Sequence, residues 1–122
     1  MKVYISGPIA HYDLNERKKA FKCIENALLE RGFEPVNPFN NGVPDDAHWR
    51  DHMKADIALL LQCDRIYLMP GWELSKGCKL ELDVASSVGI PILNQYNSKP
   101  VSVPLCGAPF VLSVQLSCTG DL

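Results

Sequence analysis

The chain has 122 residues, of which 47% are hydrophobic and 21% charged, and its formal net charge is -2. This length corresponds to one domain, because a single hydrophobic core usually serves about 100 to 150 residues, and the composition is that of a folded globular protein. The nearly balanced charge, with lysines and arginines scattered along the chain, excludes the electrostatic footprint that a nucleic-acid polymer or an anionic membrane requires.

The first part of the chain predicts a strand, a helix and a second strand. Residues 2–6 have the β-branched and aromatic character of a buried strand, which the Gly7-Pro8 turn ends. Residues 13–32 carry apolar side chains at helical spacing, and Asp13 is the expected cap of this helix. Residues 33–36 form a short apolar strand. The loop that follows is rich in Asn, Pro, Gly and Asp, and such loops are where function tends to lie.

The same alternation continues in the second part of the chain. Residues 48–62 again show helical spacing, and residues 65–69 form an apolar strand that a Pro-Gly turn ends. A third helix is predicted for residues 75–88, with Ser75 as its N-cap and a glycine just past its end. Residues 90–94 then predict a fourth strand.

This order of elements predicts the fold class. Alternating strands and helices with right-handed crossovers indicate an α/β protein, a flavodoxin-like or Rossmann-like three-layer sandwich. We expect a parallel sheet of four or five strands, with the first four in the order 2-1-3-4. The α/β domain is expected over residues 1–95. The tail, residues 96–122, is either an extra strand or an oligomerisation arm, and its composition does not separate these. Ligands of such sheets bind beyond the carboxyl ends of the strands.

The cysteines and the N-terminus indicate a location. The five cysteines are odd in number and include no CxxC pair, which favours reduced thiols. The N-terminus runs directly into the first strand and is too short in its apolar part for a signal peptide. No stretch reaches the roughly 18 apolar residues of a membrane span. We therefore expect a cytoplasmic protein without a membrane partner.

Three segments converge on the predicted crevice: residues 4–9, Asp56 on the second helix, and residues 71–77, which lead into Glu81. A carboxylate in a crevice can attack an anomeric carbon and form a covalent glycosyl intermediate, while a second carboxylic acid protonates the departing group. Glu81 and Asp56 are the candidates for these roles. A simpler interpretation is that Glu81 and Asp56 are solvated side chains of amphipathic helices. For Tyr4, the simpler interpretation is a core residue.

Other side chains suggest contacts with a ligand. Ser75 and Gly77 lie at a helix N-terminus, whose amides bind phosphate, although Ser75 is by default a helix cap and no Walker or GxGxxG motif is present. Trp72 follows a strand, where it can stack on a planar base or pack as a lid on its own domain. His48 and His52 have i, i+4 spacing but lack a third ligand, so we expect neither metal nor cofactor.

Together these segments resemble the nucleoside 2-deoxyribosyltransferase superfamily. The residues that carry the resemblance are Tyr4-Ile5-Ser6-Gly7-Pro8-Ile9, Asp56-Ile57, Cys63-Asp64-Arg65-Ile66-Tyr67, Ser75-Lys76-Gly77 and Glu81-Leu82-Asp83-Val84-Ala85. More closely, residues 70–78 are similar to a small uncharacterised, DUF4406-like branch. The resemblance covers about residues 1 to 95.

The resemblance implies roles for the residues that match its motifs. It implies that Glu81 is the nucleophile, that Asp56 assists at the base and that Tyr4 lies near the nucleophile. In the related 2′-deoxynucleoside 5′-monophosphate N-hydrolases, a serine six residues before the nucleophile contacts the phosphate, which corresponds to Ser75. Those hydrolases have a Gly-Ser-Ile-Arg-like turn where this chain has residues 7–10, Gly-Pro-Ile-Ala. The complete set of expected substrate-binding residues is Ser6, Gly7, Pro8, Ile9, Trp72, Glu73, Ser75 and Gly77.

Three functions are consistent with the sequence. The first is cleavage or transfer at the N-glycosidic bond of a nucleoside or nucleoside 5′-monophosphate, through a covalent intermediate on Glu81. The second is a non-catalytic nucleotide-binding or sensing module. The third is an interaction protein whose apolar tail mediates assembly. By resemblance we also expect a homodimer or larger homo-oligomer, since closed symmetric assemblies are common.

Overall fold

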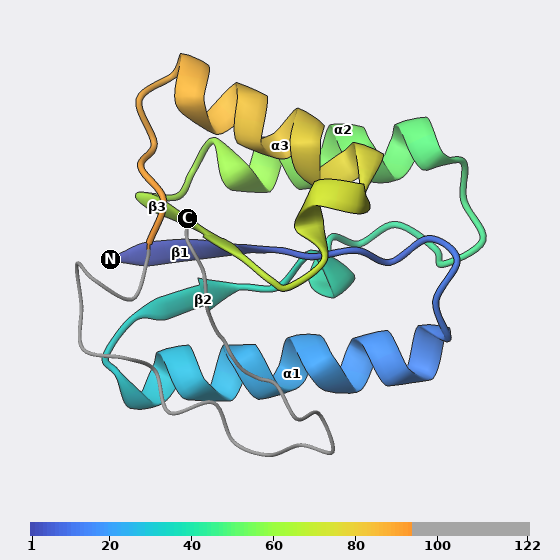
Figure 1. Ribbon diagram of the computed structural model, residues 1–122, viewed down its shortest axis with the longest axis horizontal. Coiled ribbons are helices and arrows are strands. Elements are labelled where there is room, and N and C mark those ends of the chain that lie inside the picture. The colour runs from blue at the N-terminus through green and yellow to red at the C-terminus, as the bar shows by residue number, and fades with distance from the viewer. Residues whose placement is uncertain (94–122) are drawn as a thin grey trace.

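The computed structural model describes residues 1–93, which form three layers (Figure 1). The elements follow the order β1 (Lys2–Ser6), α1 (Leu14–Glu30), β2 (Glu34–Val36), η1 (Pro38–Asn40), α2 (Trp49–Leu60), β3 (Arg65–Leu68), η2 (Trp72–Leu74) and α3 (Lys76–Ser87), where η denotes a short 3-10 helix. Helix α1 covers one face of the sheet, and α2 and α3 lie together over the other. This is the predicted mixed α/β fold.

The sheet is parallel, and β1 is its central strand. The strand order is β2-β1-β3, with Tyr4 of β1 paired to Val36 of β2 and to Ile66 of β3. The prediction for the first three strands, 2-1-3, is therefore confirmed. Their carboxyl ends meet at one edge of the sheet, and the turns that follow β1 and β3 lie there.

The predicted fourth strand is reduced to one bridge within the described residues. Ile92 makes an isolated parallel bridge to Ile66 of β3, through hydrogen bonds from Ile66 N to Pro91 O (3.1 Å) and from Leu93 N to Ile66 O (2.9 Å). Pro91 has no N–H to extend this ladder. A sheet of four or five strands is thus not confirmed, and the predicted tail, residues 96–122, lies outside the described residues.

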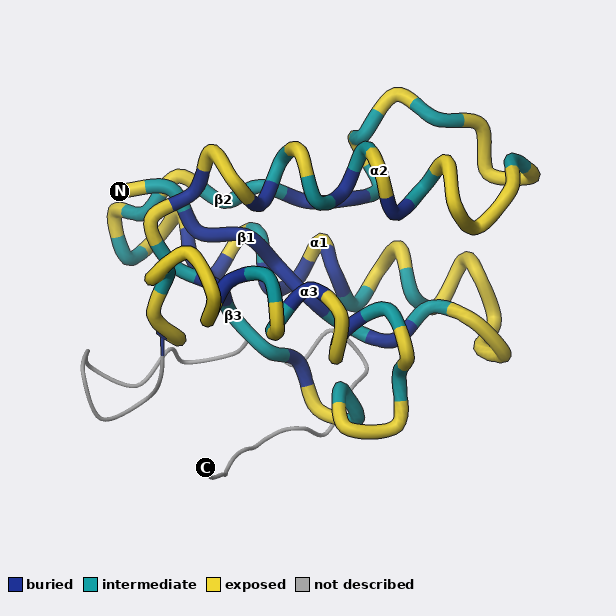
Figure 2. The backbone as a smooth tube through the Cα atoms, turned by 90° about the horizontal axis from the view of Figure 1, so that it is seen from above, coloured by how far each residue is buried: buried dark blue, intermediate teal, exposed yellow. Residues whose placement is uncertain are grey.

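Strand β1 is buried from Val3 to Ser6 (Figure 2), and its alternate side chains face opposite sides of the sheet. Val3 and Ile5 belong to the hydrophobic cluster that includes buried residues of α1. Tyr4 belongs to the second cluster, with residues of α2 and α3. Because side chains two apart in a strand share a face, Ser6 lies on the same side as Tyr4. The strand thus presents two hydroxyl groups to the α2–α3 layer.

The turn after β1 packs tightly against the rest of the sheet. At Gly7, an added Cβ atom would lie 2.5 Å from Met69 Sδ and 3.0 Å from Phe21 Cζ. Real Cβ atoms do not approach so closely, so a side chain at this position would force its neighbours apart. Glycine here allows the end of β1 to lie directly beside the end of β3.

The predicted helix caps of α1 and α3 are present. Asp13 accepts a hydrogen bond from Glu16 N at 2.9 Å, and Ser75 Oγ accepts one from Cys78 N at 3.2 Å. Each bond satisfies an amide that the first turn of a helix leaves free. The cap at Ser75 fixes the start of α3 and therefore the position of the residues along it.

The cysteines follow the prediction only in part. Cys63 and Cys78 are free and buried, as expected for reduced thiols. Cys23 of α1 is disulfide-bonded, so the prediction that all five cysteines are reduced is wrong for this residue. An odd number of cysteines still allows a pair among them to be bridged. Among residues 1–93, no helix has the length and apolar character needed to cross a membrane.

Candidate active site

Glu81 of α3 lies buried against the sheet, with only 5% of its surface exposed. Its two carboxylate oxygens accept separate hydrogen bonds from β1: Tyr4 Oη donates to Oε2 and Ser6 Oγ donates to Oε1, each at 2.7 Å. The two donors stand on the same face of β1 because they are two residues apart. Together they fix the position and the plane of the Glu81 carboxylate.

Burial also sets the protonation of Glu81. The pKa of this carboxyl is raised from 4.5 to about 7, mainly because burial removes water from it; the charge of Asp56 also raises the pKa, and the hydrogen bonds from Tyr4 and Ser6 lower it. The pKa of Tyr4 is raised well above 10, mainly by burial, so its hydroxyl stays a donor. Glu81 therefore exchanges its proton near neutral pH, as groups used in catalysis commonly do.

Asp56 of α2 is the second buried acid, with 7% of its surface exposed. Asn41 Nδ2 donates a hydrogen bond to Asp56 Oδ1 at 2.8 Å. Burial raises the pKa of Asp56, while the Asn41 bond and the charge of His52 lower it. Since the Asp56 charge also raises the pKa values of Glu81 and Tyr4, the two acids share one electrostatic environment.

The two acids occupy equivalent positions on their helices. The buried residues of α3 are Cys78, Glu81 and Ala85, and those of α2 are Met53, Asp56 and Leu60. In each helix the acid therefore stands three residues after one buried side chain and four before the next, which places it on the inward face. The interpretation of Glu81 and Asp56 as solvated side chains is wrong, and this spacing explains their burial.

These pKa shifts predict how stability depends on pH. The pKa of Glu81 is about 7 in the folded chain and near 4.5 when unfolded, so between these values the folded state binds the additional proton. The free energy of unfolding should then be highest below about pH 4.5 and fall as pH rises to about 7. The loss is on the order of 3 kcal/mol, since one pKa unit corresponds to about 1.4 kcal/mol.

Denaturant unfolding of the wild type and Glu81→Gln between pH 5 and pH 8 measures this effect. The glutamine variant should show a flatter pH profile and greater stability than the wild type at pH 8. Asp83→Asn, an exposed acid on the same helix, is the control and should keep the wild-type slope. An unfolding free energy that rises with pH in the wild type would contradict the burial effect.

The predicted substrate-binding turns lie beside each other at the carboxyl edge of the sheet. A Cβ atom on Gly71 would lie 3.4 Å from Pro8 Cγ, which brings the turn after β3 against the turn after β1. Pro8 is buried and Ile9 is half-buried. Arg17 of α1, with 11% of its side chain exposed, donates from Nη1 to Pro8 O at 3.0 Å. This hydrogen bond holds the turn after β1 against α1, the helix that follows it.

The remaining predicted contacts lie around the start of α3. Ser75 caps the helix, and Gly77 faces α2, where an added Cβ would be 3.4 Å from Met53 Sδ. Trp72 is half-buried and Glu73 is exposed, both on η2. In the described part of the chain, neither side chain makes a hydrogen bond to Glu81 or Asp56. Hydrogen bonds thus join Tyr4 and Ser6 directly to Glu81. The ligand contacts of Trp72 and Glu73 stay predictions.

The sequence did not single out Asn41 or Arg17. Asn41 lies in the loop after β2 whose composition predicted a functional segment, and that composition was the available signal. Arg17 lies in the polar stripe of α1, where sequence alone does not distinguish it from solvated residues. His52, considered for a metal pair, has its Nδ1 3.3 Å from Asn41 Nδ2. Within residues 1–93 no three His, Cys, Asp or Glu side chains are grouped as metal ligands.

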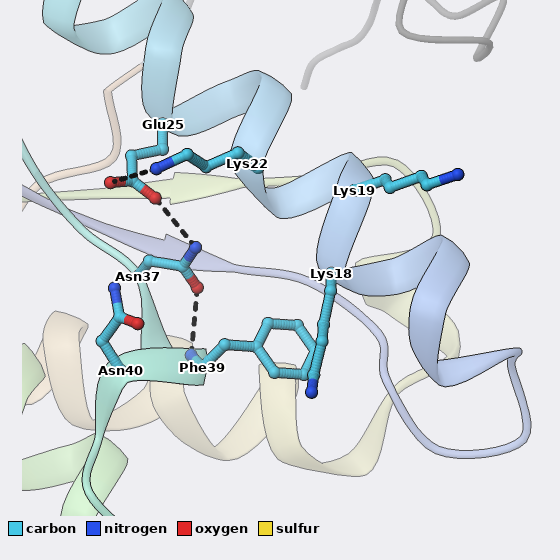
Figure 3. A pocket seen from close by; sticks show the side chains of 7 residues that line it. All are labelled: Lys18, Lys19, Lys22, Glu25, Asn37, Phe39 and Asn40. Carbon is cyan, nitrogen blue, oxygen red and sulfur yellow. Dashed lines mark hydrogen bonds and ion pairs between the residues drawn. The ribbon is translucent and has the colours of Figure 1, made fainter.

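A separate pocket of about 430 Å³ lies between α1 and η1 (Figure 3). It is lined by Lys18, Lys19, Lys22, Glu25, Asn37, Phe39 and Asn40. Lys22 pairs with Glu25 at 3.5 Å, which also accepts a bond from Asn37. The pocket is on the α1 side of the sheet, whereas Glu81 and Asp56 belong to helices on the other side. It is therefore not part of the carboxylate site.

The fold and the buried acids define a Rossmann-like α/β protein with a candidate active site at its α2–α3 face. More particularly, the chain belongs to the family described as "Domain of unknown function (DUF4406)", which matches residues 1–94. Among solved structures, the chain is similar to the Clostridium botulinum CMP N-glycosidase BcmB, at 24% sequence identity and a TM-score of 0.53. The likeness covers 75% of this chain and 68% of that one, and it shows the fold. No curated protein matches the chain.

Proposed function

We propose that the protein cleaves the N-glycosidic bond of a nucleoside or nucleoside 5′-monophosphate, or transfers its sugar, as the nucleoside 2-deoxyribosyltransferase superfamily does. The observation that carries this proposal is the buried Glu81 carboxylate, which two β1 hydroxyls hold in the same electrostatic environment as a second buried acid, Asp56. The fold shared with a protein that acts as a CMP N-glycosidase supports it.

Glu81 is the nucleophile in this proposal. Its ionised carboxylate attacks C1′, a C1′–O bond forms, and the C1′–N bond breaks with its electron pair leaving on the base. Each oxygen of a carboxylate has two lone pairs, so an oxygen that already accepts one hydrogen bond can still attack. The bonds from Tyr4 and Ser6 stabilise the ionised form and hold it in place for attack. Water or a second base then releases the sugar from Glu81.

Asp56 is the acid that assists the departing base. Burial raises its pKa, which keeps a larger share of the carboxyl protonated at neutral pH than in water. In the productive arrangement Asp56 carries a proton while Glu81 is ionised. Donation of that proton to a ring nitrogen or to a carbonyl oxygen of the base offsets the negative charge that develops as the bond breaks.

The substrate contacts come from the edge of the sheet. We propose that the turn of residues 7–9 forms one wall of the site and that Ser75 and Gly77, at the start of α3, bind the 5′ end. The positive end of a helix favours a phosphate there. Trp72 and Glu73 contact the base or the sugar from η2. The homo-oligomeric state, the cytoplasmic location and the division at residue 95 stay predictions.

A panel assay tests the proposal. The protein is incubated with nucleosides and nucleoside monophosphates, beginning with CMP and dCMP, and free base is measured by chromatography. We expect base release, with monophosphates preferred over the corresponding nucleosides by about tenfold or more, which corresponds to about 1.4 kcal/mol. Addition of a second free base distinguishes transfer, which yields a new nucleoside, from hydrolysis. Absence of base release across the whole panel would overturn the proposal.

The alternative is a nucleotide-binding module without turnover. It is favoured by the fact that both oxygens of Glu81 already accept hydrogen bonds in the structure, an arrangement that also suits a purely structural carboxylate. Calorimetry of the same panel separates the two, because a sensing module would bind a nucleotide and release no base over hours. The third function, assembly through the tail, involves residues outside the described part of the chain.

A further inference from the structure

Asn41 makes three contacts that together fix the orientation of its amide group. Its Oδ1 accepts a hydrogen bond from Val43 N at 2.8 Å. Its Nδ2 donates to Asp56 Oδ1 at 2.8 Å and lies 3.3 Å from His52 Nδ1. The amide therefore joins the loop after η1 to two side chains of α2.

The partners decide which end of the amide faces Asp56. A backbone N–H only donates, so the atom that faces Val43 N must be the amide oxygen. The NH2 group then faces α2, and it only donates as well. One hydrogen is directed to Asp56, and His52 Nδ1 lies 3.3 Å from the same nitrogen. Rotation of the amide by 180° would place its oxygen against a carboxylate oxygen and its NH2 against the Val43 N–H.

This orientation restricts the position of the proton on Asp56. Because the Asn41 NH2 group only donates, Oδ1 must accept, and the carbonyl oxygen of a protonated carboxyl is a stronger acceptor than its hydroxyl oxygen. The bond therefore favours the form of Asp56 that carries its proton on Oδ2. We propose that Asn41 is a positioning residue that directs the acidic proton of Asp56 to Oδ2, the oxygen available to a departing base. This inference rests on the proposed role of Asp56 as the acid.

The charged and titratable groups around Asp56 come from each neighbouring element. His52 lies on α2 itself, and the charge of Asp56 acts on Glu81 of α3 and on Tyr4 of β1. Asn41 is the neutral contact from the loop. Loss of its NH2 group removes a donor that favours the ionised form of Asp56, so the carboxyl should then hold its proton to higher pH.

Two substitutions separate the positioning role from a structural one. Asn41→Ala removes all three contacts. Asn41→Asp keeps the size and the oxygen that can accept from Val43 N, but it replaces the NH2 donor with an acceptor. The control is Asn40→Ala, because Asn40 is the exposed neighbour on η1 and its side chain lines the lysine-lined pocket (Figure 3).

The first measurement needs no activity. The carboxyl carbon of Asp56 is titrated by NMR in the wild type and the three variants, with circular dichroism to check folding. We expect the Asp56 titration midpoint to rise in Asn41→Ala and to rise further in Asn41→Asp, and to stay at the wild-type value in Asn40→Ala. Unchanged midpoints in both folded Asn41 variants would overturn the inference.

The second measurement is the pH profile of base release. Both Asn41 variants should lose about tenfold in kcat, the scale of one hydrogen bond to a charged group, and the limb of the profile that reports Asp56 should move to higher pH. A uniform loss with an unshifted profile would indicate a structural role and contradict the proposal. If the wild type releases no base, the proposed function fails, whereas the carboxyl titration still decides the role of Asn41.

Discussion

Glu81→Gln is expected to reduce base release by at least about 10⁴-fold, the scale on which removal of a covalent nucleophile acts. Glutamine has the same shape, and its carbonyl oxygen can still accept a hydrogen bond from Tyr4 or Ser6, so the site should keep its packing. It lacks the ionised oxygen that attacks C1′. The loss should therefore appear in kcat, with little change in the binding of substrate.

Quenched time courses with the best substrate of the panel measure this loss, and thermal melting shows that the variant is folded. Asp83→Asn is the matched control, because Asp83 is an exposed acid on the same helix. It should retain wild-type turnover. Base release by Glu81→Gln at a rate near that of the wild type would remove Glu81 from the mechanism, whatever the function of the protein.

Asp56→Asn is expected to lower kcat by about 10²- to 10³-fold for natural nucleosides, within the range of general acid catalysis. The asparagine can still occupy the buried position beside Asn41, but it has no acidic proton to give to the base. The effect should depend on the leaving group. A substrate whose leaving group departs without protonation, such as an aryl glycoside with a nitro substituent, should lose less than about tenfold.

The comparison of the two substrates is the informative measurement. Asp51→Asn provides the control, since Asp51 is an exposed acid in the first turn of α2. An equal loss with both leaving groups would show that Asp56 supports the fold of the site and does not supply a proton. A complete loss of folding in Asp56→Asn would be recognised by circular dichroism, and the leaving-group comparison would then be made with Asp56→Ser.

The alternation of elements in the sequence was sufficient to predict the α/β fold and the order of its first three strands. Those predictions depended on local features: the apolar strands, the caps at Asp13 and Ser75, and the Pro-Gly turns. Within the described residues the predicted fourth strand is a single bridge, because the hydrophobic pattern of residues 90–94 does not account for the ladder bond that Pro91 cannot make. Strand pairing also depends on neighbours that are distant in sequence.

The candidate site was predicted in part. Helical spacing contained the information that Glu81 and Asp56 face inward, since each stands between two buried side chains at i−3 and i+4. Hydrophobicity alone does not predict this burial, because an acidic side chain is normally assigned to the surface. The hydrogen bond from Ser6 to Glu81 follows from the alternation of side chains along β1, once it is known that α3 packs on the face that Ser6 shares with Tyr4.

The position of Asn41 could not be predicted from the sequence. Its contact with Asp56 depends on the path of the whole loop between η1 and α2, which neither spacing nor composition specifies. Similarly, Arg17 reaches the turn after β1 only because α1 folds back along the sheet. Contacts of this kind are set by tertiary structure, whereas caps and periodic faces are set locally.

The most direct test of the central claim is mass spectrometry of the protein quenched during turnover of its best substrate. If Glu81 is the nucleophile, a peptide containing Glu81 should carry the mass of the substrate's sugar, with its phosphate where the substrate is a monophosphate, and fragmentation should place it on Glu81. The adduct should be absent from Glu81→Gln. A sugar adduct on any other residue, or steady turnover by Glu81→Gln, would contradict the account.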